Sequence, residues 1–351
     1  MVAASCIGPP PPPPTTTSVP SSPSTSMAPP TTSDTTPPGT GAFGVNASAG
    51  ARFDGPALAV DLGARWVRVN ASIDGSTGDL DKLRRWLDQG FNLVITMDHR
   101  QPGNVVTTYG TLREHPRAGF PYRDATVFSQ SLTAQIQPLA GYLDQGRSVI
   151  LQSENEIGDA SYSKSIFWRG TIDDYLTLER TFYETVKSVD PRFGVSLTSW
   201  PSQAMTALAD PDDPRHAAAE ARSTKLLDGG TYDAVDLHFY GCTSQIAAGA
   251  TWFAGRLKPG TYWISTENAG PTIYCNSVFS NWRGNLDRFE QEKAAEVPQR
   301  LQACVASGGR VCLWFSLFNL DDEVDWANHL GLVSTSGATS VAYDSFKQLV
   351  G

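Results

Sequence analysis

The chain has 351 residues, of which 40% are hydrophobic and 18% are charged, and its 27 Lys and Arg against 36 Asp and Glu give a formal net charge of −9. This composition is typical of a globular protein and excludes a fibrous or wholly disordered one. An acidic chain without a run of Lys or Arg is not expected to bind the phosphate backbone of a nucleic acid. No stretch approaches the ~18 consecutive apolar residues of a membrane-spanning helix.

The first forty residues differ in composition from the rest. Residues 8–40 are almost wholly Pro, Thr and Ser, and residues 9–14 are six consecutive prolines. So little apolar surface cannot offset the entropy of ordering, and residues 1–41 are therefore predicted to form a disordered, extended tether. Cys6, just ahead of it, resembles the lipid-bearing first residue of a mature bacterial lipoprotein. The resemblance implies a secreted or cell-surface protein anchored at Cys6; the alternative is a tail without function.

From residue 42 to the end, short β-branched and apolar runs alternate with longer segments of helical periodicity. The predicted strands span residues 43–47, 66–69, 93–97, 148–152, 194–198, 234–239, 262–266 and 310–316. The predicted helices span residues 80–89, 130–144, 172–189, 217–227, 288–306 and 342–350. This alternation is typical of an α/β fold with a parallel sheet and right-handed crossovers. Eight units, with no Gly-x-Gly-x-x-Gly after the first strand, predict a single (β/α)8 TIM barrel over residues 42–351.

Four cysteines follow Cys6, and four cysteines allow three pairings. We predict Cys242–Cys275 and Cys304–Cys312, with buried free thiols as the alternative for the second pair. The chain has no Cys-x-x-Cys motif and no Cys/His cluster at zinc spacing. Neither a metal nor a cofactor is therefore expected.

Two of the predicted strands end in carboxylates. The apolar residues 149–151 run into Gln-Ser-Glu-Asn-Glu, which ends at Glu156, and the strand that begins at Tyr262 runs through Trp-Ile-Ser-Thr to Glu267. In a TIM barrel the chemistry belongs at the carboxyl ends of the strands. Two carboxyl groups that face one pocket can divide the work, one protonated to donate to a leaving oxygen and the other ionised as nucleophile. The sequence thus predicts a catalytic carboxyl pair.

These features resemble the retaining glycoside hydrolases of clan A, which carry Asn-Glu at the end of strand four and Glu at the end of strand seven. Asn155 and Glu156 match the first motif, and Glu267 matches the second in a Trp-x-x-Thr-Glu setting. The resemblance implies a β-glycosidase that acts on a β-linked oligo- or polysaccharide through a covalent glycosyl-enzyme. It implies that Glu156 is the general acid/base, that Glu267 is the nucleophile and that Asn155 holds the hydroxyl next to the reacting carbon.

Four more residues match motifs of the clan. Arg68 resembles its second-strand arginine, which would keep Glu267 ionised. His238 and Tyr240 resemble its sixth-strand His-x-Tyr, which implies that Tyr240 hydrogen-bonds the nucleophile and that His238 lies near the substrate. Trp314 resembles the eighth-strand tryptophan that floors the reacting sugar.

Three further residues are candidate substrate contacts. Trp200 follows the fifth strand and either stacks on a sugar or packs against the barrel. His99, within the Asp-His-Arg of residues 98–100, closes the third strand and is expected to line the cleft. Glu154 either binds a hydroxyl or faces solvent. Among the other tryptophans, Trp252 is expected to pack in the core, while platform and packing roles stay open for Trp282 and Trp326.

Other function classes fit the sequence less well. No Gly-x-Ser-x-Gly turn and no strand ending in His-x-His are present, which disfavours serine and metal-dependent hydrolases. A cell-surface barrel that only binds carbohydrate and a transglycosidase with the same site stay open as alternatives. The filled catalytic positions favour an enzyme, which we expect to be a monomer. The sugar, and endo or exo action, depend on the irregular segments 101–126 and 271–286.

Overall fold

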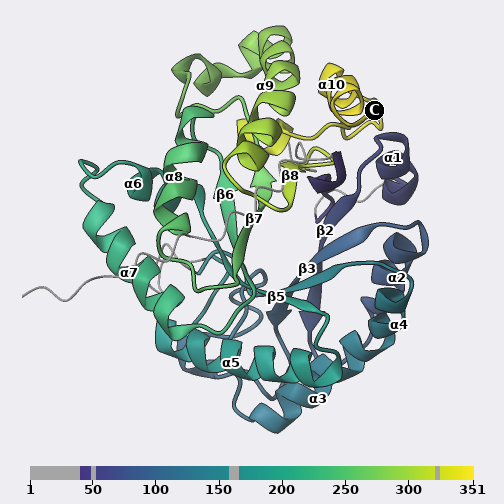
Figure 1. The fold of residues 1–351 in the computed structure, drawn as a ribbon, viewed down its shortest axis with the longest axis vertical. Helices are drawn as coiled ribbons and strands as arrows, with labels where there is room; N and C mark the ends of the chain where they lie inside the picture. Colours follow the sequence, from purple (N-terminus) through teal and green to yellow (C-terminus); the bar gives the residue numbers. More distant parts are fainter. Residues whose placement is uncertain (1–39, 49–52, 158–165, 321–324) are drawn as a thin grey trace, which may run out of the picture. The chain divides into compact units, whose positions relative to one another are not determined.

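The computed structural model describes residues 40–48, 53–157, 166–320 and 325–351. Their core is a closed barrel of eight parallel strands in sequence order, in which β8 pairs with β1 (Figure 1). The strands are β1 Phe43–Asn46, β2 Trp66–Ile73, β3 Asn92–His99, β4 Val149–Ser153, β5 Gly194–Trp200, β6 Ala234–Phe239, β7 Tyr262–Asn268 and β8 Cys312–Phe315. The predicted (β/α)8 barrel is confirmed, with all eight predicted strands present. Cys6 and the predicted tether up to residue 39 lie outside the described residues.

Helices surround the strands (Figure 1). They are α1 Gly55–Asp61, α2 Leu80–Asp88, α3 Ala125–Ile136, α4 Ala140–Asp144, α5 Ile172–Val189, α6 Ser202–Ala209, α7 His216–Gly229, α8 Ser244–Ala254, α9 Leu286–Ala306 and α10 Val341–Val350. Short 3-10 helices lie at Thr40–Ala42, Thr107–Tyr109, Gln137–Leu139, Ser277–Asn281, Arg283–Asn285 and Trp326–His329. In the described part of the chain, no helix combines the length and hydrophobicity of a membrane span.

The helix boundaries follow local sequence signals where these are strong. α5 begins with a capping box, in which Asp174 N donates to Thr171 Oγ1 at 3.1 Å and Thr171 N donates to Asp174 Oδ2 at 2.8 Å. The helix predicted over residues 130–144 is instead divided between α3 and α4. Pro138 lies in the 3-10 turn between them, because proline cannot continue the hydrogen-bond ladder of an α-helix.

The first and last helices contact each other. Tyr343 in α10 donates to Asp61 Oδ2 in α1 at 2.7 Å, and Lys347 donates to the same carboxylate at 3.0 Å. α1 and α10 accordingly lie side by side, although nearly the whole chain separates them (Figure 1).

Both predicted disulfides are present. Cys242–Cys275 joins the segment after β6 to the segment after β7, with Cα atoms 5.3 Å apart. Cys304–Cys312 joins the end of α9 to the start of β8 over a Cα distance of 6.1 Å. The alternative of free thiols at Cys304 and Cys312 is therefore not realised.

Candidate active site

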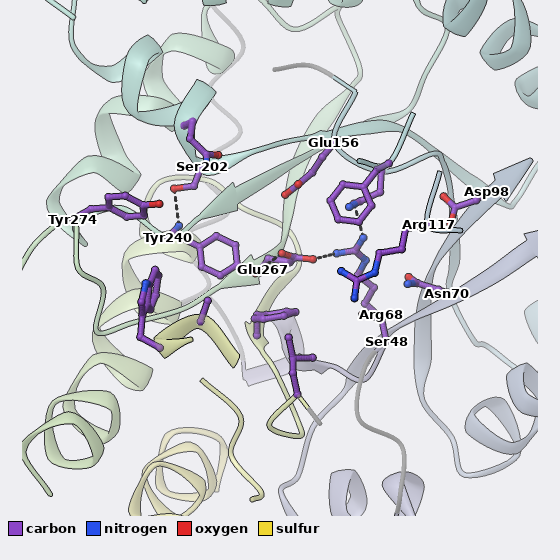
Figure 2. Close-up of a pocket in the computed structure, with 17 residues that line it drawn as sticks. Ser48, Arg68, Asn70, Asp98, Arg117, Glu156, Ser202, Tyr240, Glu267 and Tyr274 are labelled. Carbon is purple, nitrogen blue, oxygen red and sulfur yellow. Dashed lines mark hydrogen bonds and ion pairs between the residues drawn. The ribbon is translucent and has the colours of Figure 1, made fainter. Parts of the chain in front are cut away.

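A cavity of about 570 Å³ lies at the carboxyl ends of the strands (Figure 2). Its charged and amide lining residues are Arg68, Asn70, Asp98, Arg117, Asn155, Glu156, Gln203 and Glu267. Its aromatic lining residues are Phe167, Tyr240, Tyr274, Phe315 and Trp326. Flat apolar rings together with amides and carboxylates suit a polyhydroxylated ligand that has apolar ring faces.

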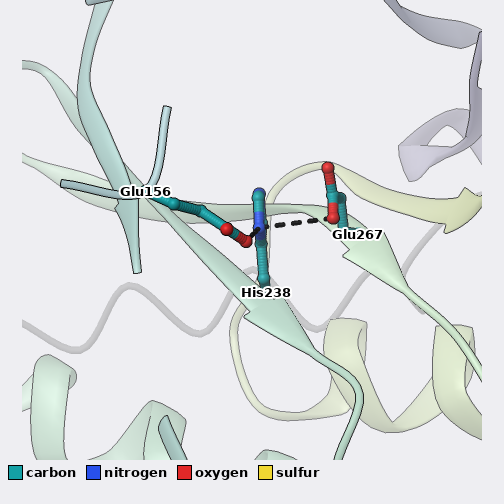
Figure 3. Close-up of side chains that lie close together, drawn as sticks. All are labelled: Glu156, His238 and Glu267. Carbon is teal, nitrogen blue, oxygen red and sulfur yellow. Dashed lines mark hydrogen bonds and ion pairs between the residues drawn. The ribbon is translucent and has the colours of Figure 1, made fainter. Parts of the chain in front are cut away.

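Glu156 and Glu267 face each other across this cavity, with His238 between them (Figure 3). One oxygen of each carboxylate and one nitrogen of His238 all lie within 4.8 Å of one another. The Glu156 side chain is 20% exposed and that of Glu267 is 11% exposed, so both can reach a molecule in the cavity. The structure thus brings together the two glutamates that the sequence places 111 positions apart.

Both oxygens of Glu267 accept hydrogen bonds. Arg68 Nη1 donates to Oε1, and Tyr240 Oη donates to Oε2. The buried Arg68 is itself fixed by two more hydrogen bonds, from Nε to Thr96 Oγ1 at 2.9 Å and from Nη2 to Asn155 Oδ1 at 2.7 Å. Burial alone would lower the pKa of Arg68, but the negative charges of Glu267 and of the neighbouring carboxylates together outweigh burial and raise that pKa. Glu267 therefore sits in a set of donors that fits a carboxylate.

A second buried ion pair, between His238 and Asp236, adjoins the two glutamates. His238 Nδ1 is 2.7 Å from Glu156 Oε1, and its Nε2 is 3.2 Å from Asp236 Oδ2. Burial alone would lower the pKa of His238, but the charges of Glu267 and Asp236 raise it to about 10. Burial would likewise raise the pKa of Asp236, but the charge and hydrogen bond of His238, together with the charge of Arg68 and the hydrogen bond of Thr266, hold it at about 2. His238 is therefore a cation and Asp236 an anion at neutral pH.

The turn after β4 brings Glu156 into the cavity at a cost in backbone energy. Glu154 and Glu156 have φ angles of 61° and 43°, in the left-handed region that side chains disfavour. Hydrogen bonds hold this turn: Glu156 N donates to Ser199 Oγ at 3.0 Å, and Ser199 Oγ donates to Asn155 Oδ1 at 2.7 Å. Such strain, on the order of 1–3 kcal/mol per residue, is found at functional sites where neighbouring structure imposes it.

Trp314 does not line the cavity, contrary to the prediction. It is fully buried, and its Nε1 donates to the Leu330 carbonyl at 3.0 Å. Side chains alternate along a strand, and its neighbours Leu313 and Phe315 lie inside the barrel, in the apolar interior and in the cavity wall respectively. Trp314 therefore faces the surrounding helices, and Phe315 is the aromatic residue that β8 offers to the cavity.

Trp200 and His99 are also packing residues, so the prediction that His99 lines the cleft is wrong. Trp200 is fully buried, donates from Nε1 to Ser223 Oγ at 2.9 Å and packs on Phe253 with ring centroids 5.1 Å apart. The packing alternative therefore holds for Trp200. The buried His99 ring packs edge-on against Phe128 at 5.2 Å. The preceding residue, Asp98, is the one that lines the cavity.

Glu154 neither lines the cavity nor faces solvent. It is fully buried, and its Oε1 accepts a hydrogen bond from the backbone N–H of His99 at 2.8 Å. Burial and the nearby charge of Asp98 raise its pKa well above the usual range. Both alternatives predicted for Glu154 are therefore wrong. It is a buried acid that stabilises the end of β3 through its hydrogen bond with the His99 backbone.

The open predictions for the other tryptophans are resolved by burial. Trp252 is buried as expected, and Trp282 is buried and stacks on His329 at 4.6 Å. Trp326 lines the cavity.

Glu156, His238 and Glu267 are ligand types that a divalent metal ion accepts, and their spacing is short enough for one. The donors already on Glu267 argue against such use. The Arg68 guanidinium binds one of its oxygens and the Tyr240 hydroxyl binds the other, and the charge of Arg68 repels a cation. The arrangement suits proton transfer and nucleophilic attack instead.

Neither a protein-family model nor a curated protein sequence matches the chain. Several solved structures share its fold. A glucosidase from Croceicoccus marinus superposes with a TM-score of 0.57 at 13% identity, covering 89% of this chain and 65% of the glucosidase. A GH5_18 protein from Streptomyces cattleya in complex with GlcNAc gives 0.54 at 13% identity, covering 88% and 79%. A psychrophilic glycoside hydrolase family 10 endo-beta-1,4-xylanase gives 0.53 at 11% identity, covering 87% and 96%.

The chain spans only 54% and 65% of the length of two of the matched structures. At these identities the likeness establishes the fold, and the resemblance seen in the sequence is confirmed at that level. The chain has the (β/α)8 barrel that these glycoside hydrolases share.

Proposed function

We propose that the protein is a retaining β-glycosidase that hydrolyses a β-linked oligo- or polysaccharide with Glu156 as general acid/base and Glu267 as nucleophile. The observation that carries the proposal is the approach of the two carboxylates, whose oxygens come within 4.8 Å across the cavity. Retaining enzymes separate their carboxyl groups by about 5–5.5 Å, whereas inverting enzymes need roughly 6.5–9.5 Å to admit a water molecule. The short approach favours retention.

The contacts and the exposure of the pair favour this assignment of roles. Arg68 and Tyr240 each donate to an oxygen of Glu267, so its carboxylate is held in place from both sides. The Glu156 side chain is the more exposed of the two, at 20% against 11%. Glu267 is thus the better nucleophile, and Glu156 is the carboxyl group better placed to exchange a proton with the leaving oxygen and with water.

In the first step, protonated Glu156 donates to the glycosidic oxygen while a Glu267 oxygen attacks the anomeric carbon. The bond between that carbon and the leaving oxygen breaks, and the sugar is left as an ester of Glu267. In the second step, ionised Glu156 removes a proton from water, and the water oxygen attacks the anomeric carbon. This releases Glu267 as a carboxylate and restores the proton on Glu156.

Other residues of the cavity would hold the sugar. Asn155 accepts from Arg68 and Ser199 at its Oδ1, so its amide NH2 is the end that can donate to the hydroxyl beside the reacting carbon. Phe315, Tyr274 and Trp326 offer flat surfaces for the apolar faces of sugar rings.

A barrel that only binds carbohydrate is disfavoured by the cost of the site. Removing the charges of Arg68 and Glu267 from water costs several kcal/mol per ion before their attraction is counted. A pure binding site gains nothing specific from that cost, whereas a nucleophile needs it.

The test uses Glu156→Ala with an aryl β-glycoside whose leaving group needs no protonation. We expect the glycosyl-enzyme to form but to break down slowly, because no base activates water, and azide to restore turnover by attacking the intermediate directly. Glu184→Ala, which changes an exposed glutamate on α5, is the matched control and should keep wild-type activity. Full activity of Glu156→Ala without azide would contradict the assignment.

We also infer an exported protein, because two disulfides form and persist in an oxidising compartment. The lipid anchor at Cys6 and the monomeric state stay predictions.

A further inference from the structure

Arg117 lies in the wall of the cavity, on the same side as Arg68, Asn70 and Asp98 (Figure 2). Arg68 is committed to Glu267, Thr96 and Asn155. Arg117, by contrast, has no hydrogen-bond or ion-pair partner within the described residues. The cavity wall therefore holds one positive charge that forms no ion pair with a described side chain.

The segment that carries Arg117 is basic in an otherwise acidic chain. Between residues 100 and 123, which connect β3 to α3, there are four arginines and one glutamate, whereas the whole chain has a net charge of −9. Asp98 is the acidic neighbour on this wall, and one of its oxygens is buried. Burial raises the pKa of Asp98 to about 6, which weakens its opposition to an anion in mildly acidic solution.

The position of Arg117 is imposed by the fold. Arg100 Nη1 donates to the carbonyl of Ala118 at 2.5 Å, and Gly119 N donates to the carbonyl of Phe167 at 2.9 Å. The buried carboxyl of Glu154 lies so close to Gly119 that a Cβ there would collide with it. The backbone next to Arg117 is thus fixed from three sides, and its side chain is presented to the cavity by a rigid segment.

We propose that Arg117 binds an anionic group of the substrate, so that the cavity accepts an acidic β-glycan, one whose sugars carry a carboxylate or a sulfate ester. A guanidinium matches the planar pair of oxygens of a carboxylate and also binds sulfate through two hydrogen bonds. The proposal rests on the proposed function in taking the ligand to be a β-glycan. It adds that charge, as well as ring shape, selects the substrate.

The experiment measures binding by calorimetry to the full chain carrying Glu156→Gln, an inactive form that keeps the ion pair between Arg68 and Glu267. The ligands are two matched pairs: a β-linked uronate oligosaccharide with its carboxyl-reduced form, and a sulfated oligosaccharide with its desulfated form. We expect at least one acidic ligand to bind more tightly than its neutral partner. Adding Arg117→Gln should lower the affinity for that acidic ligand by about tenfold or more, because a charge-assisted hydrogen bond is lost. The affinity for its neutral partner should stay unchanged. The pair that responds identifies the anion.

Arg113→Gln is the matched control, because Arg113 is an exposed arginine of the same segment that does not line the cavity. It should leave both affinities unchanged. Equal affinity for acidic and neutral partners, or an equal loss for both in Arg117→Gln, overturns the inference. If the wild-type chain hydrolyses neutral oligosaccharides as fast as their acidic partners, the inference is overturned while the proposed function is supported. Arg117-dependent binding of acidic ligands without any hydrolysis would support the inference and contradict the proposed function.

Discussion

The two ends of the barrel interior are built from the same strands but from opposite kinds of residue. At the amino end, Val94, Ile150, Ile264, Val311 and Leu313 form a buried apolar cluster. At the carboxyl end, the interior holds two cations and several carboxylates. Hydrogen bonds join them, from Arg68 to Glu267 and between His238 and Asp236.

The transition between the two ends is short and ordered. In β4, Ile150 belongs to the apolar cluster, and two residues later Gln152 donates to Asp236 at 2.8 Å and accepts from Thr96 at 2.6 Å. A further turn of chain brings Glu156 to the cavity. The apolar end supplies stability that does not depend on charge, and the carboxyl end can therefore bear buried ions and strained backbone.

The largest effect is expected when one member of the buried ion pair is removed. Arg68→Met leaves the Glu267 carboxylate buried without its cation, which should cost about 3–5 kcal/mol of stability. The value of kcat/KM should fall about 100- to 1000-fold, because a preorganised charged donor is lost. Denaturant unfolding and steady-state kinetics measure the two effects.

A double variant separates the charge from the packing at this position. Arg68→Met combined with Glu267→Gln removes both charges and should recover much of the stability lost by Arg68→Met alone. If the double variant is as unstable as the sum of the single variants, the two side chains are not coupled, and the account of the carboxyl end is wrong.

The opposite end should respond in stability alone. Leu313→Ala removes a fully buried side chain from the apolar cluster and should cost about 2–5 kcal/mol of unfolding free energy. At a temperature where the variant is folded, kcat should stay near the wild-type value, because Leu313 touches neither glutamate. A large fall in kcat of the folded variant would show that the two ends are not separable.

Neighbouring residues of β8 provide a finer comparison. Phe315→Ala should lower kcat/KM by about tenfold through loss of a sugar contact, with a small change in melting temperature. Trp314→Phe should lower the melting temperature through lost packing and leave kcat/KM almost unchanged. The reverse pattern would restore Trp314 as the residue under the sugar.

The smallest effect on catalysis is expected for a buried acid far from the cavity. Burial raises the pKa of Glu179 from 4.5 to about 8, and its Oε2 accepts from Thr231 N at 3.0 Å. Between these pH values the unfolded chain releases a proton that the folded chain keeps, so stability is highest below the window and falls as pH rises through it. Glu179→Gln should flatten this fall in melting temperature. An unchanged pH profile would contradict the burial of a neutral Glu179.

The sequence could predict the barrel and the core of the site because both depend on short local patterns. Apolar runs that end in polar residues located the strand ends, and the motifs around Glu156, Glu267, Arg68 and Tyr240 placed these side chains in one cavity. His238 was predicted to lie near the substrate, but it is fully buried and does not line the cavity. Helices α6 and α8 were not predicted, because Ser202–Ala209 and Ser244–Ala254 contain no charged residue to mark a polar face.

The errors have a common physical origin. In β8 every residue from Val311 to Phe315 is apolar, so polarity gives no sign of which side chains point inward, and Trp314 was assigned to the wrong face. Arg117 lies in an irregular segment without periodicity. Its place in the cavity depends on contacts with Gly119 and Ala118 that only the folded chain reveals.

In the proposed mechanism, Glu267 attacks a sugar held opposite Glu156. Incubation of the full chain with an activated 2-deoxy-2-fluoro β-glycoside, which slows breakdown of the intermediate, followed by mass spectrometry of the peptides, tests it most directly. We expect one fluorosugar to be added to the peptide that contains Glu267 and to no other peptide. The fluorosugar is the analogue of a glycoside that the enzyme hydrolyses. If it forms no adduct, or labels another carboxylate such as Asp98 or Glu156, Glu267 is not the nucleophile.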